Sequence, residues 1–62
     1  MNNLRKYRKL NKLTQVQLAK LAGMKWHTFI SQCENGEKRL PFDLGKKLAK
    51  ILDVDVYDLM GD

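Results

Sequence analysis

Turn-forming residues recur so closely along this chain that each regular element is limited to about a dozen residues. Asn11-Lys12, Gly23 and Asn35-Gly36 mark three such interruptions. Between them, apolar residues recur three or four positions apart, which is the period of an amphipathic helix. No segment alternates apolar and polar residues over the length of a strand. The sequence therefore predicts an all-α protein built from short helices.

Five helices are predicted from this pattern and from the residues that cap helix ends. Thr14 and Gln17 fit a capping box, in which the side chain of each residue bonds the backbone N–H of the other. Asp55 is a suitable N-cap for the last helix, and Gly23 is a suitable end for the second. The predicted helices cover about Asn3–Leu10, Thr14–Ala22, Trp26–Glu34, Pro41–Leu52 and Val56–Met60.

The apolar stripe of each helix supplies the predicted core. Ala19 is small where another helix is expected to cross the second one. Gly45 disfavours its helix by about 1 kcal/mol relative to alanine, so we expect close packing there. Cys33 is interpreted as a small core residue rather than a reactive thiol. The residues expected to face the core are Leu4, Tyr7, Leu10, Leu18, Leu21, Ala22, Ile30, Cys33, Leu44, Leu48, Ile51 and Leu52.

The length of the chain limits what this core can support. A domain of 62 residues buries only about 60% of its unfolded surface, which leaves little material for a deep catalytic pocket. The sequence contains no Ser/His/Asp set, no phosphate-binding glycine loop and no Cys/His cluster with zinc spacing. We therefore predict a single domain over residues 1–62 that is not an enzyme and takes no cofactor, metal ion or small-molecule substrate.

The same features bear on where such a protein works. A lone cysteine forms no internal disulfide, which suits a reducing cytoplasm. No run of about 18 apolar residues is present to span a membrane, and the first residues lack the apolar segment of a signal peptide. We expect a cytoplasmic protein with no membrane partner.

The net charge of +5 is unevenly distributed. Residues 1–50 contain all 12 Lys and Arg with three acidic residues, whereas residues 51–62 contain four acidic residues and no basic one. Such a distribution fits a polyanion bound by one face, although a basic surface also serves solubility alone.

The stretch from Leu13 to Gly36 joins a capped helix, a turn glycine and a second short helix. In this respect the chain resembles the Cro and phage-repressor type of helix-turn-helix domain. The resemblance runs from Leu4 to Met60. It rests on Leu4-x-x-Tyr7-Arg8, Leu13-Thr14-Gln15, Leu18-Ala19, Gly23, Glu34-Asn35-Gly36, Leu48-Ala49-Lys50 and the segment from Val54 to Leu59.

The resemblance implies a five-helix lambda-repressor-like fold, in which the second helix braces the DNA backbone and the third reads bases in the major groove. It implies a bacterial or phage regulator that binds a double-stranded DNA operator. It also implies that Gln15 contacts a phosphate, as a residue at a helix start is placed to do, and that Arg8 pairs with Glu34 to join the first and third helices.

The turn before the third helix departs from the family by one residue. Either the turn is longer and Ile30 faces inward, or Phe29 takes the inward position. The second arrangement would bury Gln32 instead of Cys33, and burying an unpaired amide is unfavourable. We therefore favour the longer turn.

With that turn, the base-reading residues are predicted to be His27, Thr28, Ser31 and Gln32. Gln32 is the strongest candidate, because glutamine can form two hydrogen bonds with adenine; His27 and Ser31 are alternatively ordinary surface residues. Trp26 is predicted to pack under the third helix, with a contact to a sugar or base methyl as the alternative. The predicted phosphate contacts are Gln15, Lys25, Asn35, Lys38 and Arg39.

The leading interpretation is a repressor or Cro-like protein that binds a palindromic operator as a homodimer, either preformed or formed on DNA. The C-terminal end is more apolar than its helix requires, so the dimer interface is predicted at Val56, Tyr57, Leu59 and Met60. The alternative is a protein-interaction module on the same fold, such as an antitoxin-like or anti-regulator protein. An exposed Trp26–Phe29 face would favour that alternative.

Overall fold

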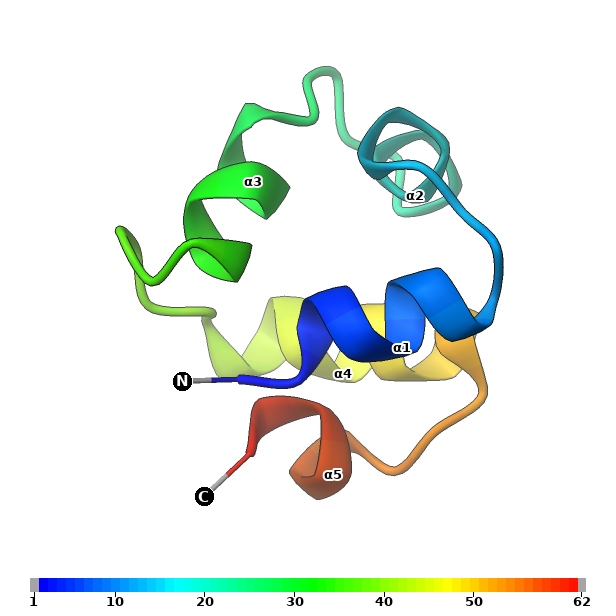
Figure 1. Ribbon diagram of the computed structural model, residues 1–62, viewed down its shortest axis with the longest axis vertical. Helices are drawn as coiled ribbons and strands as arrows, with labels where there is room; N and C mark the ends of the chain where they lie inside the picture. The colour runs from blue at the N-terminus through cyan, green and yellow to red at the C-terminus, as the bar shows by residue number, and fades with distance from the viewer. Residues whose placement is uncertain (1, 62) are drawn as a thin grey trace.

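The computed structural model describes residues 2–61, which form five helices and no strand. The helices are α1 (Leu4–Leu10), α2 (Gln15–Leu21), α3 (Thr28–Glu34), α4 (Phe42–Leu52) and α5 (Val56–Met60). The turn between α2 and α3 stands at one end of the molecule, and α5 lies at the opposite end (Figure 1). The all-α prediction is confirmed.

Local hydrogen bonds account for most of the helix boundaries. Thr14 and Gln17 form the predicted capping box at the start of α2, and the side chain of Asp55 accepts from the backbone N–H of Tyr57 at the start of α5. Gly23 has a φ of 73°, a left-handed conformation that costs glycine little. Four predicted helices therefore agree with the structure to within one residue at each end.

The third helix begins two residues later than predicted, at Thr28 instead of Trp26. The backbone N–H of Met24 donates to the carbonyl of Ala19, and the Met24 side chain packs against the core. These contacts of Met24 close the end of α2. The residues that follow, up to His27, form the rest of the turn that leads to α3. The longer turn that the sequence favoured is confirmed, because Ile30 and Cys33 are buried.

The core lies where the five helices meet. Its fully buried side chains are Leu4, Leu18, Ile30, Cys33, Leu48, Leu52 and Leu59. The predictions for Leu10 and Leu21 are wrong, since these residues are 67% and 58% exposed. Each is the last residue of its helix, and its side chain lies at the edge of the core in contact with solvent.

Two small residues permit close helix packing. Ala19 is 3% exposed within the core. Gly45 is buried in α4, and a Cβ at that position would collide with the Sδ atom of Met60 in α5. The close contact expected at Gly45 is therefore present, and it seats α5 against α4.

None of the helices in residues 2–61 has the length and apolar character needed to cross a membrane.

Candidate nucleic-acid interface

The outer face of α3 carries three of the four predicted base-reading residues. Ile30, Cys33 and Glu34 are buried on the inner face of this helix, and successive residues of a helix are about 100° apart. Thr28 and Gln32 therefore lie on the opposite side, and Ser31 lies at its edge. Thr28 is exposed and the other two are half-buried.

His27 and Trp26 precede this helix. His27 is the exposed N-cap residue of α3, and its side chain forms no capping hydrogen bond. The prediction that Trp26 packs under the helix is wrong, because Trp26 is 69% exposed. It lies in the turn, and Ile30 and Cys33 already fill the space beneath α3. Phe29 is half-buried against the core, so no exposed Trp26–Phe29 face is formed.

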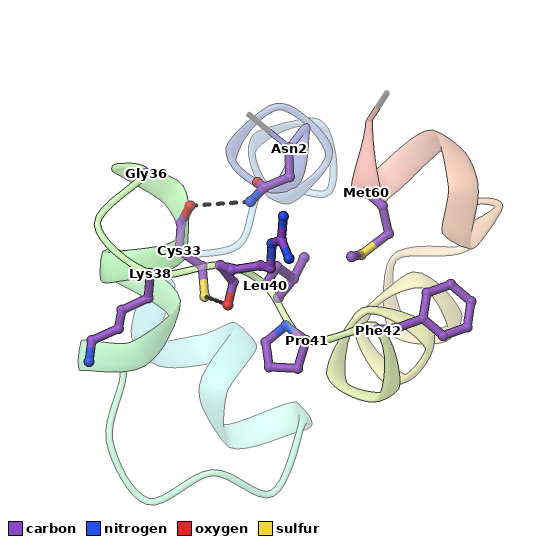
Figure 2. A pocket seen from close by; sticks show the side chains of 9 residues that line it. Asn2, Cys33, Gly36, Lys38, Leu40, Pro41, Phe42 and Met60 are labelled. Atoms are coloured by element: carbon purple, nitrogen blue, oxygen red, sulfur yellow. Dashed lines mark hydrogen bonds between the residues drawn. The ribbon is translucent and has the colours of Figure 1, made fainter.

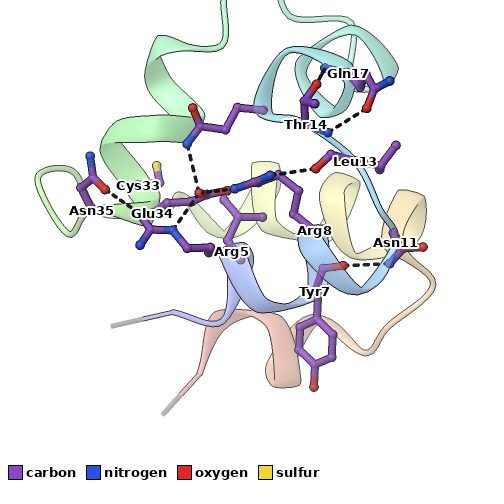
Figure 3. Close-up of polar contacts among 12 residues, drawn as sticks. Arg5, Tyr7, Arg8, Asn11, Leu13, Thr14, Gln17, Cys33, Glu34 and Asn35 are labelled. Atoms are coloured by element: carbon purple, nitrogen blue, oxygen red, sulfur yellow. Dashed lines mark hydrogen bonds and ion pairs between the residues drawn. The ribbon is translucent and has the colours of Figure 1, made fainter.

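Glu34 is the centre of a buried polar cluster that joins three helices (Figure 3). Its side chain is fully buried, and the Arg8 side chain is 10% exposed. Arg8 Nε donates to Glu34 Oε2 at 2.6 Å and Arg8 Nη2 to Oε1 at 3.1 Å, which is the pairing implied by the family resemblance. Arg8 Nη1 also donates to the carbonyl of Leu13 at 2.7 Å. This bidentate geometry fixes α1 against α3.

Two further side chains complete the cluster around Glu34. Arg5 Nε donates to Glu34 Oε1 at 3.2 Å, and Gln15 Nε2 donates to the same oxygen at 3.1 Å. Arg5 was not among the predicted site residues, although it stands three residues before Arg8 and so on the same face of α1. We call Arg5, Arg8, Gln15 and Glu34 the Glu34 cluster.

Burial alone raises the pKa of the Glu34 carboxyl, but the hydrogen bonds from Arg8, Gln15 and Arg5 lower it by more. The net result is a pKa below the ordinary value of 4.5. A carboxyl whose pKa is lower in the folded state stabilises the fold above its unfolded pKa and loses that contribution as the pH falls through the folded value.

We therefore expect Glu34→Gln to lower the melting temperature most near neutral pH. The difference from the wild type shrinks as the pH falls below about 4.5, because protonated Glu34 and glutamine are both neutral. Thermal unfolding followed by circular dichroism between about pH 7 and about pH 2 tests this. A difference that stays constant over that range would contradict it. Glu37→Gln, at an exposed position, serves as the control.

The predicted phosphate contacts lie around α3. Lys25, Lys38 and Arg39 are exposed. Asn35 is exposed as well, with its Oδ1 accepting from Arg5 at 2.6 Å. Gln15 is half-buried in the Glu34 cluster. Its amide nitrogen carries two hydrogens, so the bond to Glu34 leaves one hydrogen for a phosphate.

The predicted dimer residues are only partly at the surface. Tyr57 is 70% exposed, and Val56 and Met60 are half-buried. The prediction that Leu59 belongs to the dimer interface is wrong, because Leu59 is 0% exposed and belongs to the core. Phe42 was missed: it is 45% exposed, and its ring centroid lies 6.0 Å from that of Tyr57.

Phe42 and Met60 lie on one side of a hollow of about 590 Å³, and Gly36 and Lys38 lie on the other (Figure 2). Phe42, Tyr57 and Met60 thus form an apolar group at the end of the molecule that carries α5, and we call it the C-terminal patch. Neither the α3 face nor this patch holds a metal-binding group of three or more His, Cys, Asp or Glu among residues 2–61.

Comparison with known proteins identifies the family of this chain. A protein-family model described as helix-turn-helix matches residues 4–59. No curated protein matches the chain.

Proposed function

Because the chain belongs to the Cro-like helix-turn-helix family of DNA-binding transcription regulators, we propose that it is a repressor or Cro-like protein that binds a palindromic operator. In this proposal α3 lies in the major groove, two copies bind two half-sites, and the protein acts in the cytoplasm of a bacterial or phage-infected cell.

The observation that carries this proposal is the division of α3 into two faces. One face is held in the core through Ile30, Cys33 and Glu34. The other presents Thr28, Ser31 and Gln32, side chains that can bond or contact base edges. A helix held on one side and polar on the other suits insertion into a groove about 12 Å wide.

The C-terminal patch supports the proposal of a dimer. One α3 covers only a few base pairs, so two copies are needed for useful specificity, with half-sites about 34 Å apart. Exposed aromatic residues are enriched at protein interfaces, and Tyr57 and Phe42 meet that description. Asp53 follows α4, and Asp55 and Asp58 belong to the start of α5. That helix lies at the end of the molecule opposite the α2–α3 turn (Figure 1).

The test is selection of duplexes from a randomised pool, followed by sequencing of the bound fraction and anisotropy titration of the enriched sequence. We expect an inverted repeat with half-site centres about one helical turn apart. Absence of binding at low salt would overturn the proposal. It would favour the antitoxin-like or anti-regulator alternative, for which the exposed Trp26 is the one supporting observation.

Gln32→Ala is expected to weaken operator binding by about 1–3 kcal/mol for each half-site and to relax preference at one position. The physical reason is the loss of two hydrogen bonds to an adenine. Repeating the selection with this variant identifies that position, and Glu37→Ala serves as a control on the loop that follows α3. An unchanged motif would show that Gln32 does not read a base. The melting temperature should not change, since Gln32 lies outside the core.

A further inference from the structure

Trp26 is the single tryptophan of the chain, and it is 69% exposed in the turn between α2 and α3. Its indole is a large apolar group left in water. Folding gains little from a side chain in this position, because the apolar surface remains hydrated. Its placement therefore points to a contact made outside the folded chain.

A hollow of about 280 Å³ lies beside this indole. Its apolar lining comes from Val16 of α2, which is 49% exposed, and from Met24 and Trp26 of the turn. Lys20, Lys25 and His27 also line the hollow, and the two lysines carry positive charge. We call it the turn hollow and define it by Val16, Lys20, Met24, Lys25, Trp26 and His27.

The composition of the turn hollow indicates the chemistry of its occupant. A lining that is mainly apolar but includes Lys20 and Lys25 matches a small apolar group that has anionic groups next to it. A deoxyribose with its two flanking phosphates has this form, since the sugar ring presents C–H groups and each phosphate carries one negative charge.

We propose that the turn hollow binds one deoxyribose of the DNA backbone, with Trp26 and Val16 against the sugar and Lys20 and Lys25 at the flanking phosphates. The proposal rests on the proposed function and adds a backbone contact to it. In helix-turn-helix docking the first helix of the pair crosses the backbone and the N-terminal part of the second reads bases. Here the first helix of the pair is α2. The hollow is built from α2 and the turn that follows it, which places it at the DNA backbone.

Trp26 allows a direct test, because its fluorescence reports on this site alone. We expect the selected operator and a scrambled duplex each to protect Trp26 from quenching by acrylamide, since every duplex supplies a sugar. Lys20→Gln should lower the dependence of log K on log salt by about one for each half-site.

Trp26→Ala should weaken binding by about tenfold for each half-site, equally for the operator and the scrambled duplex, with no change in salt dependence. Trp26→Phe should restore most of this loss. Leu10→Ala removes another exposed apolar side chain and should leave binding unchanged. Melting temperatures of these variants show whether each is folded, and an exposed tryptophan should be replaced without loss of stability.

Three results would overturn the proposal while leaving the proposed function intact. The first is that the operator binds while Trp26 remains as accessible to acrylamide as in the free protein. The second is that Trp26→Ala weakens binding to one sequence only and that deoxyuridine in place of one thymidine has the same effect. This result would assign Trp26 to a contact with a base methyl. The third is that Trp26→Ala leaves DNA affinity unchanged and abolishes binding to a protein. If no duplex binds at any salt concentration, the proposed function fails first.

Discussion

Replacing Glu34 by alanine is expected to leave most of the protein unfolded at room temperature. The change removes the acceptor for Arg8, Arg5 and Gln15 and leaves the Arg8 guanidinium buried without its partner. Removing one partner of a buried ion pair lowers the free energy of unfolding by about 3–5 kcal/mol. A core of this size rarely supplies more than about 3–5 kcal/mol in total. Urea and thermal unfolding followed by circular dichroism measure the effect.

Two further variants distinguish the loss of the pair from a change in charge. Glu37→Ala makes the same charge change at an exposed position with one hydrogen bond of 3.4 Å, and we expect an effect within about 0.5 kcal/mol. The double variant Arg8→Met with Glu34→Leu should recover much of the lost stability, because it removes both buried charges together. Equal melting temperatures for Glu34→Ala and Glu37→Ala would contradict the role assigned to the Glu34 cluster.

The second large effect expected is on the salt dependence of operator binding. Without the Lys20 contact proposed above, Lys25, Lys38 and Arg39 are three exposed cations around α3, which gives six in the proposed dimer. Each neutralised phosphate contributes about −0.9 to the slope of log K against log salt. A rise from about 50 to about 200 mM salt should therefore weaken binding roughly a thousandfold. Anisotropy titrations at four or more salt concentrations give this slope.

Lys38→Gln should make the slope less steep by about two in a dimer, because one phosphate contact is lost in each half-site. It should weaken operator and scrambled duplexes alike, since phosphate contacts carry no sequence information. Lys50→Gln is the matched control, as this residue is exposed on α4 and is not a predicted contact. Equal slopes for the two variants would show that Lys38 does not contact a phosphate.

The helices could be predicted because their signals are local. Thr14 with Gln17, Gly23 and Asp55 define helix ends through contacts within a few residues. The helical period located Leu4, Leu18, Leu48 and Leu52 in the core. It was wrong at Leu10 and Leu21, which end α1 and α2 and are exposed. There the period continues in the sequence although the helix does not continue in space.

The parts of the site that were missed depend on the packing of distant segments. Leu59 is buried because α5 lies against α4 and α1, and the apolar pattern of a five-residue helix cannot show which face is covered. Arg5 contacts a residue 29 positions away. Trp26 is exposed because Met24 anchors the turn two residues earlier. These arrangements follow from the relative placement of helices, which sequence spacing does not contain.

The separation of the two faces of α3 has a consequence for how such a protein diverges. Glu34, Ile30 and Cys33 hold the helix, whereas Thr28, Ser31 and Gln32 lie on its other side. Substitutions at the outer positions change no core packing, so their effects on stability should be small. Under the proposed function, a lineage can therefore acquire new operator preferences by single steps at these three positions without passing through unstable intermediates.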